Sequence, residues 1–159
     1  MPDGLIIRQA TINDIPLILE LWKELMDFHK ELDPLFSRSA KGHEKFAEHV
    51  KKGICNGDCY VVAAFDGEDL AGYCMAKISK YPPVLEKQEY GEIDNIAVTE
   101  KYRRGRVGER LIGEVRKWYR EKGIDRIEAK VSKFNKISTS FWAKMGFRPY
   151  LETVFLEIE

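Results

Sequence analysis

The sequence has no excess charge of either sign, because 26 lysines and arginines balance 26 aspartates and glutamates over 159 residues. Proteins that bind nucleic acid through a broad surface usually carry a basic excess, so this balance argues against a nucleic-acid partner. No apolar run approaches the ~18 residues that a membrane span needs, and we expect no membrane association. Any strongly basic site must therefore be local.

Cysteine is also scarce, and the three residues Cys55, Cys59 and Cys74 are too few and odd in number for a disulfide framework. The opening residues, MPDGLIIRQA, lack the basic start and the long apolar run of a signal peptide. These absences predict a cytoplasmic protein. His43 and His49 precede the first two cysteines, but the spacings match no common zinc pattern, so no metal is expected.

The composition is that of a globular chain, with 44% hydrophobic and 11% aromatic residues, and its length predicts a single domain over residues 1–159. Helical spacing of apolar residues is found at about 11–30, 41–52, 107–123 and 134–146. Strand-like patterns occupy 5–10, 60–65, 70–78, 90–98 and 124–131, and residues 147–159 are expected to form two closing strands or one kinked strand. This mixed order predicts an α+β (mixed α/β) fold, with a mixed sheet covered by helices on both faces.

The stretch YRRGRVGERL, residues 102–111, concentrates positive charge at the start of a helix that follows a strand. A helix N-terminus has backbone amides without internal partners and a positive dipole end, so it binds anions and especially phosphates. Gly105 and Gly108 would let a phosphate approach the backbone. Arg103, Arg104 and Arg106 would add charged donors.

Other interpretations of this stretch stay open at this point. It could be an exposed basic turn before an ordinary amphipathic helix. The sequence GRVG also matches the G-x-x-G loop with which KH domains hold a nucleic-acid backbone, although that loop joins two helices. Neither the Walker A pattern nor the dinucleotide-binding glycine pattern is present.

The segment IAVTEKYRRGRVGERLIGEVRKWYREKG resembles the acetyl-CoA-binding segment of the GNAT family of N-acetyltransferases. The family pattern of Arg or Gln, two variable residues, Gly, one variable residue and Gly or Ala falls on residues 103–108. Arg106 stands where the family usually has glycine, and Gly105 is expected to supply the missing flexibility. A second segment, NKISTSFWAKMGF, resembles a later helix of the family, with Trp142 in place of the usual tyrosine.

The resemblance implies a central mixed sheet that splays open, with acetyl-CoA as the acetyl donor lying in the gap. The pyrophosphate would then bind the backbone amides of residues 104–108. The Val98 amide would polarise the thioester carbonyl. The residues expected to bind the cofactor are Ile96, Ala97, Val98, Arg103, Arg104, Gly105, Arg106, Val107, Gly108, Glu109, Asn135, Ser138 and Phe141.

The expected acceptor is an amine, which attacks only when neutral, although an alkylamine with a pKa of ~10.4 is mostly charged at pH 7. A base must therefore take its proton, directly or through water. Glu92 and Asp94 lie two residues apart on a strand and share one face, so both are candidate catalytic residues, with Glu92 slightly preferred. They could instead form only a polar row.

The acceptor's identity cannot be read from the sequence, and Phe28, Phe36, Tyr81 and Tyr90 are considered as walls of its site. The resemblance predicts direct transfer in a ternary complex of protein, acetyl-CoA and amine, and a homodimer is considered. An acyl-CoA-binding regulatory module without catalysis stays open, because an indole N–H is not a practical proton donor. The missing tyrosine is its main support.

Overall fold

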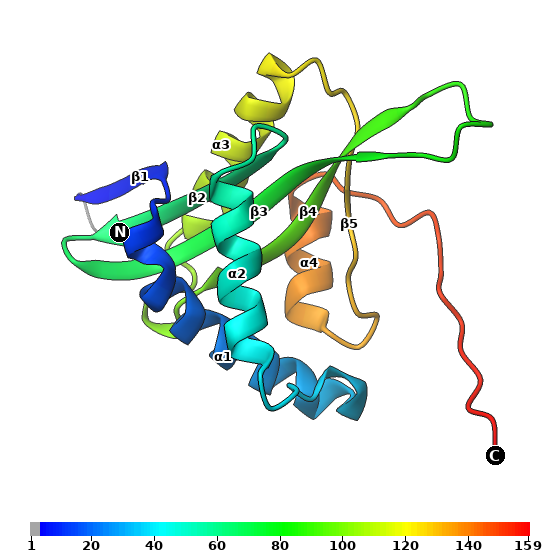
Figure 1. The fold of residues 1–159 in the computed structure, drawn as a ribbon, viewed down its shortest axis with the longest axis horizontal. Helices are drawn as coiled ribbons and strands as arrows, with labels where there is room; N and C mark the ends of the chain where they lie inside the picture. Colours follow the sequence, from blue (N-terminus) through cyan, green and yellow to red (C-terminus); the bar gives the residue numbers. More distant parts are fainter. Residues whose placement is uncertain (1–3) are drawn as a thin grey trace.

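The computed structural model describes residues 4–159 as five strands in one sheet with helices on both faces (Figure 1). The sheet order is β1-β2-β3-β4-β5, with β1 to β4 antiparallel and β5 parallel to β4. The strands are β1 Leu5–Gln9, β2 Cys59–Asp66, β3 Asp69–Lys80, β4 Glu89–Val98 and β5 Ile127–Ala129. The α-helices are α1 Ile15–Leu32, α2 Gly42–Ile54, α3 Val107–Glu121 and α4 Lys136–Lys144. Short 3-10 helices are η1 Ile12–Asp14, η2 Pro34–Phe36 and η3 Glu100–Tyr102.

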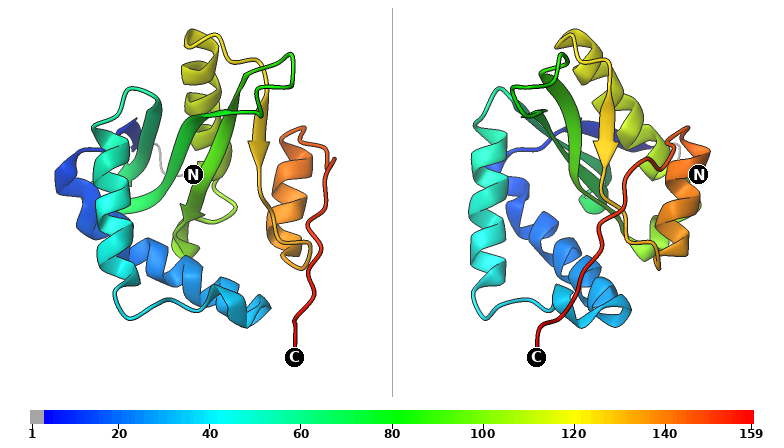
Figure 2. Two further views of the ribbon diagram at one scale, coloured as in Figure 1. Left: turned by 45° about the vertical axis from the view of Figure 1, so that its right-hand side comes forward. Right: turned by 90° about the vertical axis from the view of Figure 1, so that its right-hand side faces the viewer.

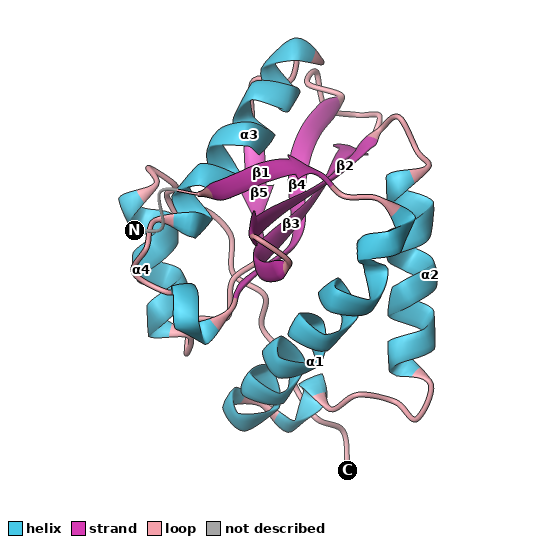
Figure 3. Cartoon of the chain, turned by 90° about the vertical axis from the view of Figure 1, so that its left-hand side faces the viewer, coloured by secondary structure: helices cyan, strands magenta, loops and turns pink. Residues whose placement is uncertain are grey.

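Two hydrophobic cores lie on opposite faces of the sheet, with α1 and α2 over one face and α3 and α4 over the other (Figure 3). Alternate residues of β2 divide between them, since Val61 and Ala63 pack in the first core and Val62 and Ala64 in the second. The predicted fold class, with its mixed sheet and helices on both faces, is confirmed.

A β-bulge interrupts β4 just before the sheet opens. Met75 of β3 pairs with Asn95, but the next residue, Ala76, pairs with Ile93, so Asp94 has no partner. Ile93 and Ile96 pack in the core under α3, whereas Asp94 contacts His49 of α2 on the opposite face. A bulge adds one residue to one strand and redirects its side chain. Here it places two consecutive polar residues, Asp94 and Asn95, on the face that α1 and α2 cover.

The sheet splays open immediately after the bulge. β4 and β5 are paired only from Gly91 to Ile93 on one strand and from Ile127 to Ala129 on the other. The rest of β4 therefore has an edge without a neighbouring strand, and α4 lies beyond the gap (Figure 2).

The structure corrects several predicted boundaries. β5 is only three residues long instead of spanning 124–131, and α2 runs past Gly53 to Ile54. The predicted closing strands are wrong, because residues 147–159 contain no strand in the part of the chain that is described. Residues 148–159, which we call the tail, run extended and exposed away from α4 (Figure 2). Its sequence has strand-like alternation, but a strand also needs a partner for its backbone groups.

Gly91 is required by the packing of Tyr119 against β4. A Cβ at this position would lie 2.6 Å from the Tyr119 ring, and the Tyr119 hydroxyl donates to the carbonyls of Lys77 and Glu92 at 3.0 and 2.9 Å. We expect Gly91→Ala to lower the free energy of unfolding by roughly 1–3 kcal/mol through overpacking. Urea unfolding measures this change.

The matched control is Gly113→Ala on the exposed side of α3, where an added Cβ would meet nothing within 4 Å. Helix propensity predicts stabilisation there, by about 0.5–1 kcal/mol. Equal stability of the two variants would contradict the packing described for Gly91.

Candidate functional site

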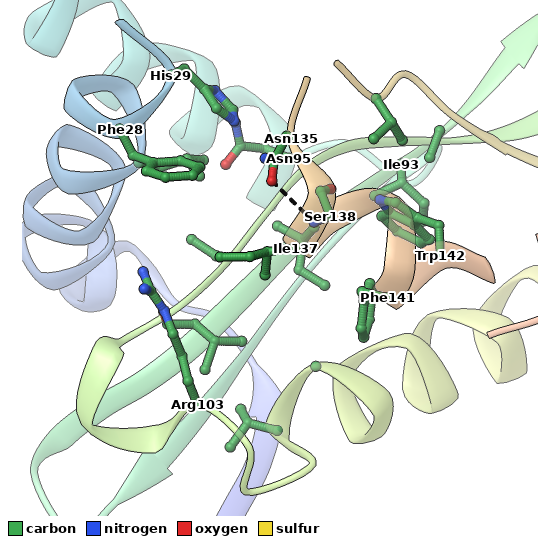
Figure 4. A pocket seen from close by; sticks show the side chains of 18 of the residues that line it. Phe28, His29, Ile93, Asn95, Arg103, Asn135, Ile137, Ser138, Phe141 and Trp142 are labelled. Atoms are coloured by element: carbon green, nitrogen blue, oxygen red, sulfur yellow. Dashed lines mark hydrogen bonds between the residues drawn. The ribbon is translucent and has the colours of Figure 1, made fainter. Parts of the chain in front are cut away.

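A cleft of about 870 Å³ occupies the gap between the splayed strands. Its floor is Ile93–Val98 of β4, one end is formed by α1 and η2, and the other end reaches the start of α3 and the facing side of α4. In Figure 4, Phe28 and His29 approach from α1, Arg103 from the loop before α3, and Phe141 from α4. Segments far apart in the sequence therefore meet around one cavity.

The start of α3 presents free backbone amides to this cleft. Arg110 is the first amide that donates within the helix, to the Arg106 carbonyl at 3.1 Å, and no side chain caps the helix start. The amides of Val107, Gly108 and Glu109 precede it and have no helical carbonyl to reach. A Cβ at Gly108 would lie only 3.0 Å from the Phe141 ring, so this glycine lets α3 and α4 pack closely beside the cleft. These features fit a phosphate group.

In the loop before α3, the residues with a left-handed backbone are arginines and not glycine. Arg104 has φ 66° and Arg106 has φ 64°, whereas Gly105 has no positive φ. The expectation that Gly105 supplies the flexibility is therefore wrong. An added Cβ at Gly105 would instead lie 3.1 Å from the Tyr102 carbonyl oxygen, so this glycine avoids crowding. Arg106 adopts the conformation that explains why glycine is common at its position in the family.

The charged side chains around this helix start are partly engaged with one another. Arg106 Nε lies 2.7 Å from Glu109 Oε2, and Lys144 Nζ lies 2.7 Å from Glu109 Oε1. Lys144 and Arg106 lower the pKa of Glu109, which stays ionised. Arg103 lines the cleft, and its Nε donates to the Val98 carbonyl at 3.3 Å. The local positive charge is thus concentrated but partly neutralised by Glu109.

The free edge of β4 offers backbone groups to an extended ligand. The Thr99 amide donates to the Ala71 carbonyl at 2.9 Å, which fixes the alternation of the antiparallel ladder. By that alternation Ile96 and Val98 direct their amides and carbonyls away from β3, and Ala97 directs its own toward β3. Two of the three residues predicted for this role therefore have backbone groups facing the gap.

The predicted residues of α4 also line the cleft. Asn135 is buried and caps the helix, because its Oδ1 accepts from the Ser138 amide at 3.0 Å (Figure 4). Its side-chain nitrogen is the group left for a ligand. Phe141 packs edge-on against Trp142, with ring centroids 5.0 Å apart, and Trp142 is buried. Trp142 therefore serves as a wall of the cleft.

The two candidate bases lie in different surroundings. Asp94 lines the cleft and its Oδ2 lies 2.6 Å from His49 Nε2, whereas Glu92 is outside the lining and accepts from Ser79 Oγ at 2.8 Å. Lys77 Nζ lies 3.8 Å from Glu92 and 3.6 Å from Asp94, so the two carboxylates do share a face. The His49 hydrogen bond lowers the pKa of Asp94, and Asp94 raises the pKa of His49.

Sequence patterns miss some residues near the site and misplace others. His49 has no local signal of a role here, because nothing in the sequence reveals the bulge that brings Asp94 to it. His29 lines the cleft, and burial lowers its pKa. Phe28 and Phe36 line the cleft as predicted, but Tyr81 and Tyr90 do not, because they stack on each other with centroids 4.2 Å apart outside it.

Two further observations concern the residues that the structure describes. Between residues 4 and 159 no three His, Cys, Asp or Glu side chains gather in a way that could hold a metal ion. None of the described helices is both long and apolar enough to cross a membrane.

The sequence model of the Acetyltransferase (GNAT) family matches residues 20–147 of this chain. The match runs from α1 past the end of α4 and so includes the whole cleft. The chain belongs to the GNAT family. The family prediction is thereby confirmed, and with it the predicted acetyl-CoA-dependent N-acetyltransferase activity. The KH-like interpretation is wrong, because the GRVG stretch here connects a 3-10 turn after a strand to a helix.

Individual proteins are similar to this chain in sequence or in fold. The chain is 24% identical over 148 residues to a spermidine N(1)-acetyltransferase of Thermoplasma acidophilum, covering 89% of this chain and 87% of that protein. A single-site mutant of the BH1408 protein of Bacillus halodurans has a similar structure, with a TM-score of 0.83, 22% identity and coverage of 97% and 99%. A predicted acetyltransferase of Clostridium acetobutylicum, solved with acetyl-CoA, has a TM-score of 0.77, 16% identity and 96% coverage of both chains.

A substitution at Gly108 tests the phosphate-binding role predicted for the start of α3. We expect Gly108→Glu to weaken acetyl-CoA binding at least tenfold, because its side chain fills the space beside Phe141 and its charge repels phosphate. Calorimetry or a thermal-shift titration measures the dissociation constant. Gly113→Glu, on the exposed side of the same helix, adds the same charge and should bind normally. An unchanged affinity in folded Gly108→Glu would exclude phosphate binding at this position.

The positive φ of Arg106 predicts an unusual order among substitutions. Arg106→Gly should unfold at nearly the same temperature as the original protein, because glycine adopts this conformation freely. Arg106→Val should lower the melting temperature by roughly 2–4 °C, since β-branched residues strongly resist a left-handed backbone. Both variants lose the same ion pair with Glu109, so charge does not distinguish them. Equal melting temperatures would contradict the assigned backbone.

Proposed function

We propose that this GNAT protein transfers the acetyl group of acetyl-CoA directly to a primary amine, with the whole chain acting as one domain. The observation that carries the proposal is the single cleft that joins the start of α3, the free edge of β4 and the Asp94 carboxylate. In our proposal one continuous cavity thus contains a phosphate site, a site for an extended arm and a base. Direct transfer needs both substrates to be bound next to each other, and this cleft has room for both.

The donor half of the cleft fits coenzyme A through backbone groups. In our proposal the free amides at the start of α3, those of Val107 and Gly108 among them, hold the pyrophosphate, and Arg103, Arg104 and Arg106 add charge around it. The Gly105 amide does not take part, because it donates to the Tyr102 carbonyl at 3.2 Å. Bound acetyl-CoA supplies an acetyl thioester at the free edge of β4. The Val98 amide points toward this edge and would donate to the carbonyl oxygen as negative charge develops on it.

The base in our proposal is Asp94 coupled to His49. Asp94 lines the cleft, so it can reach the amine, while its low pKa makes it a weak base on its own. The neutral fraction of His49 increases with pH, and in that form its Nε2 can take the proton from Asp94 through the 2.6 Å contact, while the raised pKa favours the imidazolium that results. This reverses the slight preference for Glu92 drawn from the sequence. A secondary role for Glu92 is compatible with its contact to Lys77.

A dedicated acid for the departing thiolate is not required by this arrangement. Trp142 occupies the place of the family's tyrosine and cannot donate a proton usefully. A free cysteine thiol has a pKa of ~8.5 and a plain alkyl thiol a higher one, so the thiolate can depart without a dedicated acid and be protonated afterwards. Water in the cleft can protonate it. The absence of the tyrosine therefore lowers the rate without forcing the alternative of a regulatory acyl-CoA-binding module.

The acceptor half of the cleft has both apolar and acidic walls. Phe28 and Phe36 provide apolar surface, and Glu24 on α1 adds a carboxylate on the same side as Asp94. This combination suits an alkyl chain that carries more than one amine, because one ammonium can pair with Glu24 while another is presented to Asp94. A polyamine is therefore our proposed acceptor class, in agreement with the name of the Thermoplasma relative.

The remaining proposals concern partners and location. We propose a cytoplasmic protein, supported by three free cysteines of which Cys55 is exposed. We propose no nucleic-acid or membrane partner, supported by the balanced charge. We also propose a homodimer, supported by the exposed apolar side chains of the tail, which a second copy could cover.

The catalytic assignment is tested by single substitutions. Asp94→Asn should lower kcat by ~10²-fold or more at pH 7 with spermidine as acceptor, because general-base help is typically worth that much. Acetyl-CoA affinity should not change, since Asp94 lies away from the start of α3. Glu92→Gln is the matched control and should lower kcat much less. Wild-type turnover in both variants and in the double variant would leave proton removal to water.

A panel of amine acceptors distinguishes a catalyst from a regulatory module. The wild type should acetylate spermidine faster than amino acids, aminoglycosides or peptide N-termini at equal concentration. Binding of acetyl-CoA without turnover of any amine would favour the regulatory module. Turnover only of the other amines would overturn the polyamine assignment and leave acetyl transfer intact.

The pair of His49 and Asp94 also predicts a pH dependence of stability. The raised pKa of His49 stabilises the fold below the pKa of a free imidazole, and this contribution is lost as the pH rises through the raised value. The stability that the pair contributes is also lost at acid pH, as the pH falls through the lowered pKa of Asp94. We expect His49→Gln to lower the melting temperature more at pH 6 than at pH 9. A loss independent of pH would mean that the ion pair contributes nothing.

A further inference from the structure

Among the described residues, two lysines line the cleft, and only one of them is held by a neighbouring acid. Lys144 Nζ lies 2.7 Å from Glu109 Oε1 beside the start of α3, in the half proposed for the donor. Lys130 comes directly after the last residue of β5. Beyond β5 the chain continues past the gap and then turns into α4 (Figure 2). Lys130 is thus a primary amine of the protein itself inside the proposed site of acetyl transfer.

The alternation of side chains along β5 places Lys130 on the face of the sheet that carries Asp94. Ile127, Ala129 and Val131 all pack against the core under α3. In an extended chain successive side chains point to opposite faces, so the side chain between Ala129 and Val131 points away from α3. Asp94 also lies on that opposite face, where it contacts α2. Lys130 therefore belongs to the acceptor side of the cleft.

Lys130 and Asp94 also occupy matching positions along their strands. The last residues that β4 and β5 pair are Ile93 and Ala129. Asp94 is the next residue on β4, and Lys130 is the next residue after β5. Because paired strands lie ~4.8 Å apart, both side chains start close together at the point where the cleft opens. The flexible four-carbon stem of a lysine then lets its amine reach along the cleft.

The Lys130 amine is exposed and has no fixed partner. It forms no ion pair with any other residue between 4 and 159, and the cations that Asp94 contacts are His49 at 2.6 Å and Lys77 at 3.6 Å. An amine that no carboxylate holds can move toward a bound thioester, whereas the pairing with Glu109 keeps Lys144 at the start of α3. Of the two lysines in the cleft lining, Lys130 is therefore the one placed to react.

We propose that Lys130 is a site of self-acetylation, an inference that rests on the proposed direct transfer within this cleft. When no acceptor is bound, the Lys130 ammonium loses a proton to the pair of Asp94 and His49 or to water. The neutral Nζ attacks the carbonyl carbon of the acetyl thioester, so that a C–N bond forms and the C–S bond breaks. The electron pair of the C–S bond leaves with the coenzyme A sulfur, which takes up a proton, while the nitrogen gives up its second proton. The products are Nζ-acetyl-lysine, which has lost its charge, and coenzyme A.

The first experiment incubates the protein with 13C-labelled acetyl-CoA and no amine acceptor, after a lysine deacetylase has removed any acetyl group already present. Peptide mapping by mass spectrometry measures the labelling rate at each lysine. Lys130 should be labelled at least tenfold faster than Lys133, which lies outside the cleft lining and reports direct chemical acetylation in solution. The rate at Lys130 should not change when the protein is diluted tenfold with acetyl-CoA saturating, because amine and cleft belong to one molecule. Equal rates at the two lysines, or a rate that falls on dilution, would overturn the proposal.

The second experiment uses two matched variants and a competing acceptor. Lys130→Arg keeps the positive charge but removes the nucleophile, so the fast phase of labelling should disappear from the intact protein. Lys133→Arg makes the same change outside the cleft and should keep that phase. The amine that the acceptor panel shows to react fastest should, at saturating concentration, slow labelling of Lys130 at least tenfold and leave Lys133 unaffected. A fast phase that persists in Lys130→Arg, or that ignores the competing amine, would contradict the assignment.

These outcomes separate self-acetylation from the proposed function. Turnover of a free amine without fast labelling of Lys130 would overturn self-acetylation and leave transfer to the free amine intact. Fast labelling of Lys130 without turnover of any amine in the panel would support self-acetylation, while the proposed polyamine acceptor would fail. The two conclusions can therefore fail separately.

Discussion

The opening between β4 and β5 is the constraint on which the rest of this structure depends. Pairing stops after Ile93, and the bulge at Asp94 lies at the same place. One irregularity thus creates both the free backbone edge of Ile96 and Val98 and the position of the carboxylate. Tyr119 supports it from α3, because its hydroxyl donates to one carbonyl on β3 and one on the neighbouring β4 beside the bulge. A sheet paired along its full length would have neither the cleft nor the proposed base.

The electrostatic organisation explains how a chain without net charge can bind a polyanion. The positive end of α3, the free amides and the arginines act within one turn of helix, where dipole and charge effects are strong. Glu109 pairs with Arg106 and Lys144 and so reduces the net positive charge around the helix start. In the proposed function, Asp94 and Glu24 at the other end of the cleft supply negative charge for a cationic acceptor. The two substrates would then be separated by the sign of the charge that each half of the cleft presents.

Much of the site could be predicted from the sequence because its signals are local. A strand, a turn with arginines and glycines and an amphipathic helix follow one another directly, so their junction predicts an anion site. The Asp94–His49 contact could not be predicted, since the residues are 45 positions apart and the bulge has no sequence signature. Tyr81 and Tyr90 were misplaced for a similar reason. Aromatic residues after a loop resemble a substrate wall, but here they stack on each other.

At Arg106 and in the tail, the conformation that the local sequence prefers differs from the conformation in the folded protein. At Arg106 the turn imposes a left-handed backbone on a residue that disfavours it, and the surrounding fold overrides the local preference. In the tail the local preference for a strand is strong, but nothing in the described chain satisfies it. Backbone pairing is obligatory for a strand, whereas alternation of side chains only indicates where one can form. Residues 153–158 therefore have the side-chain pattern of a strand without the backbone pairing that a strand needs.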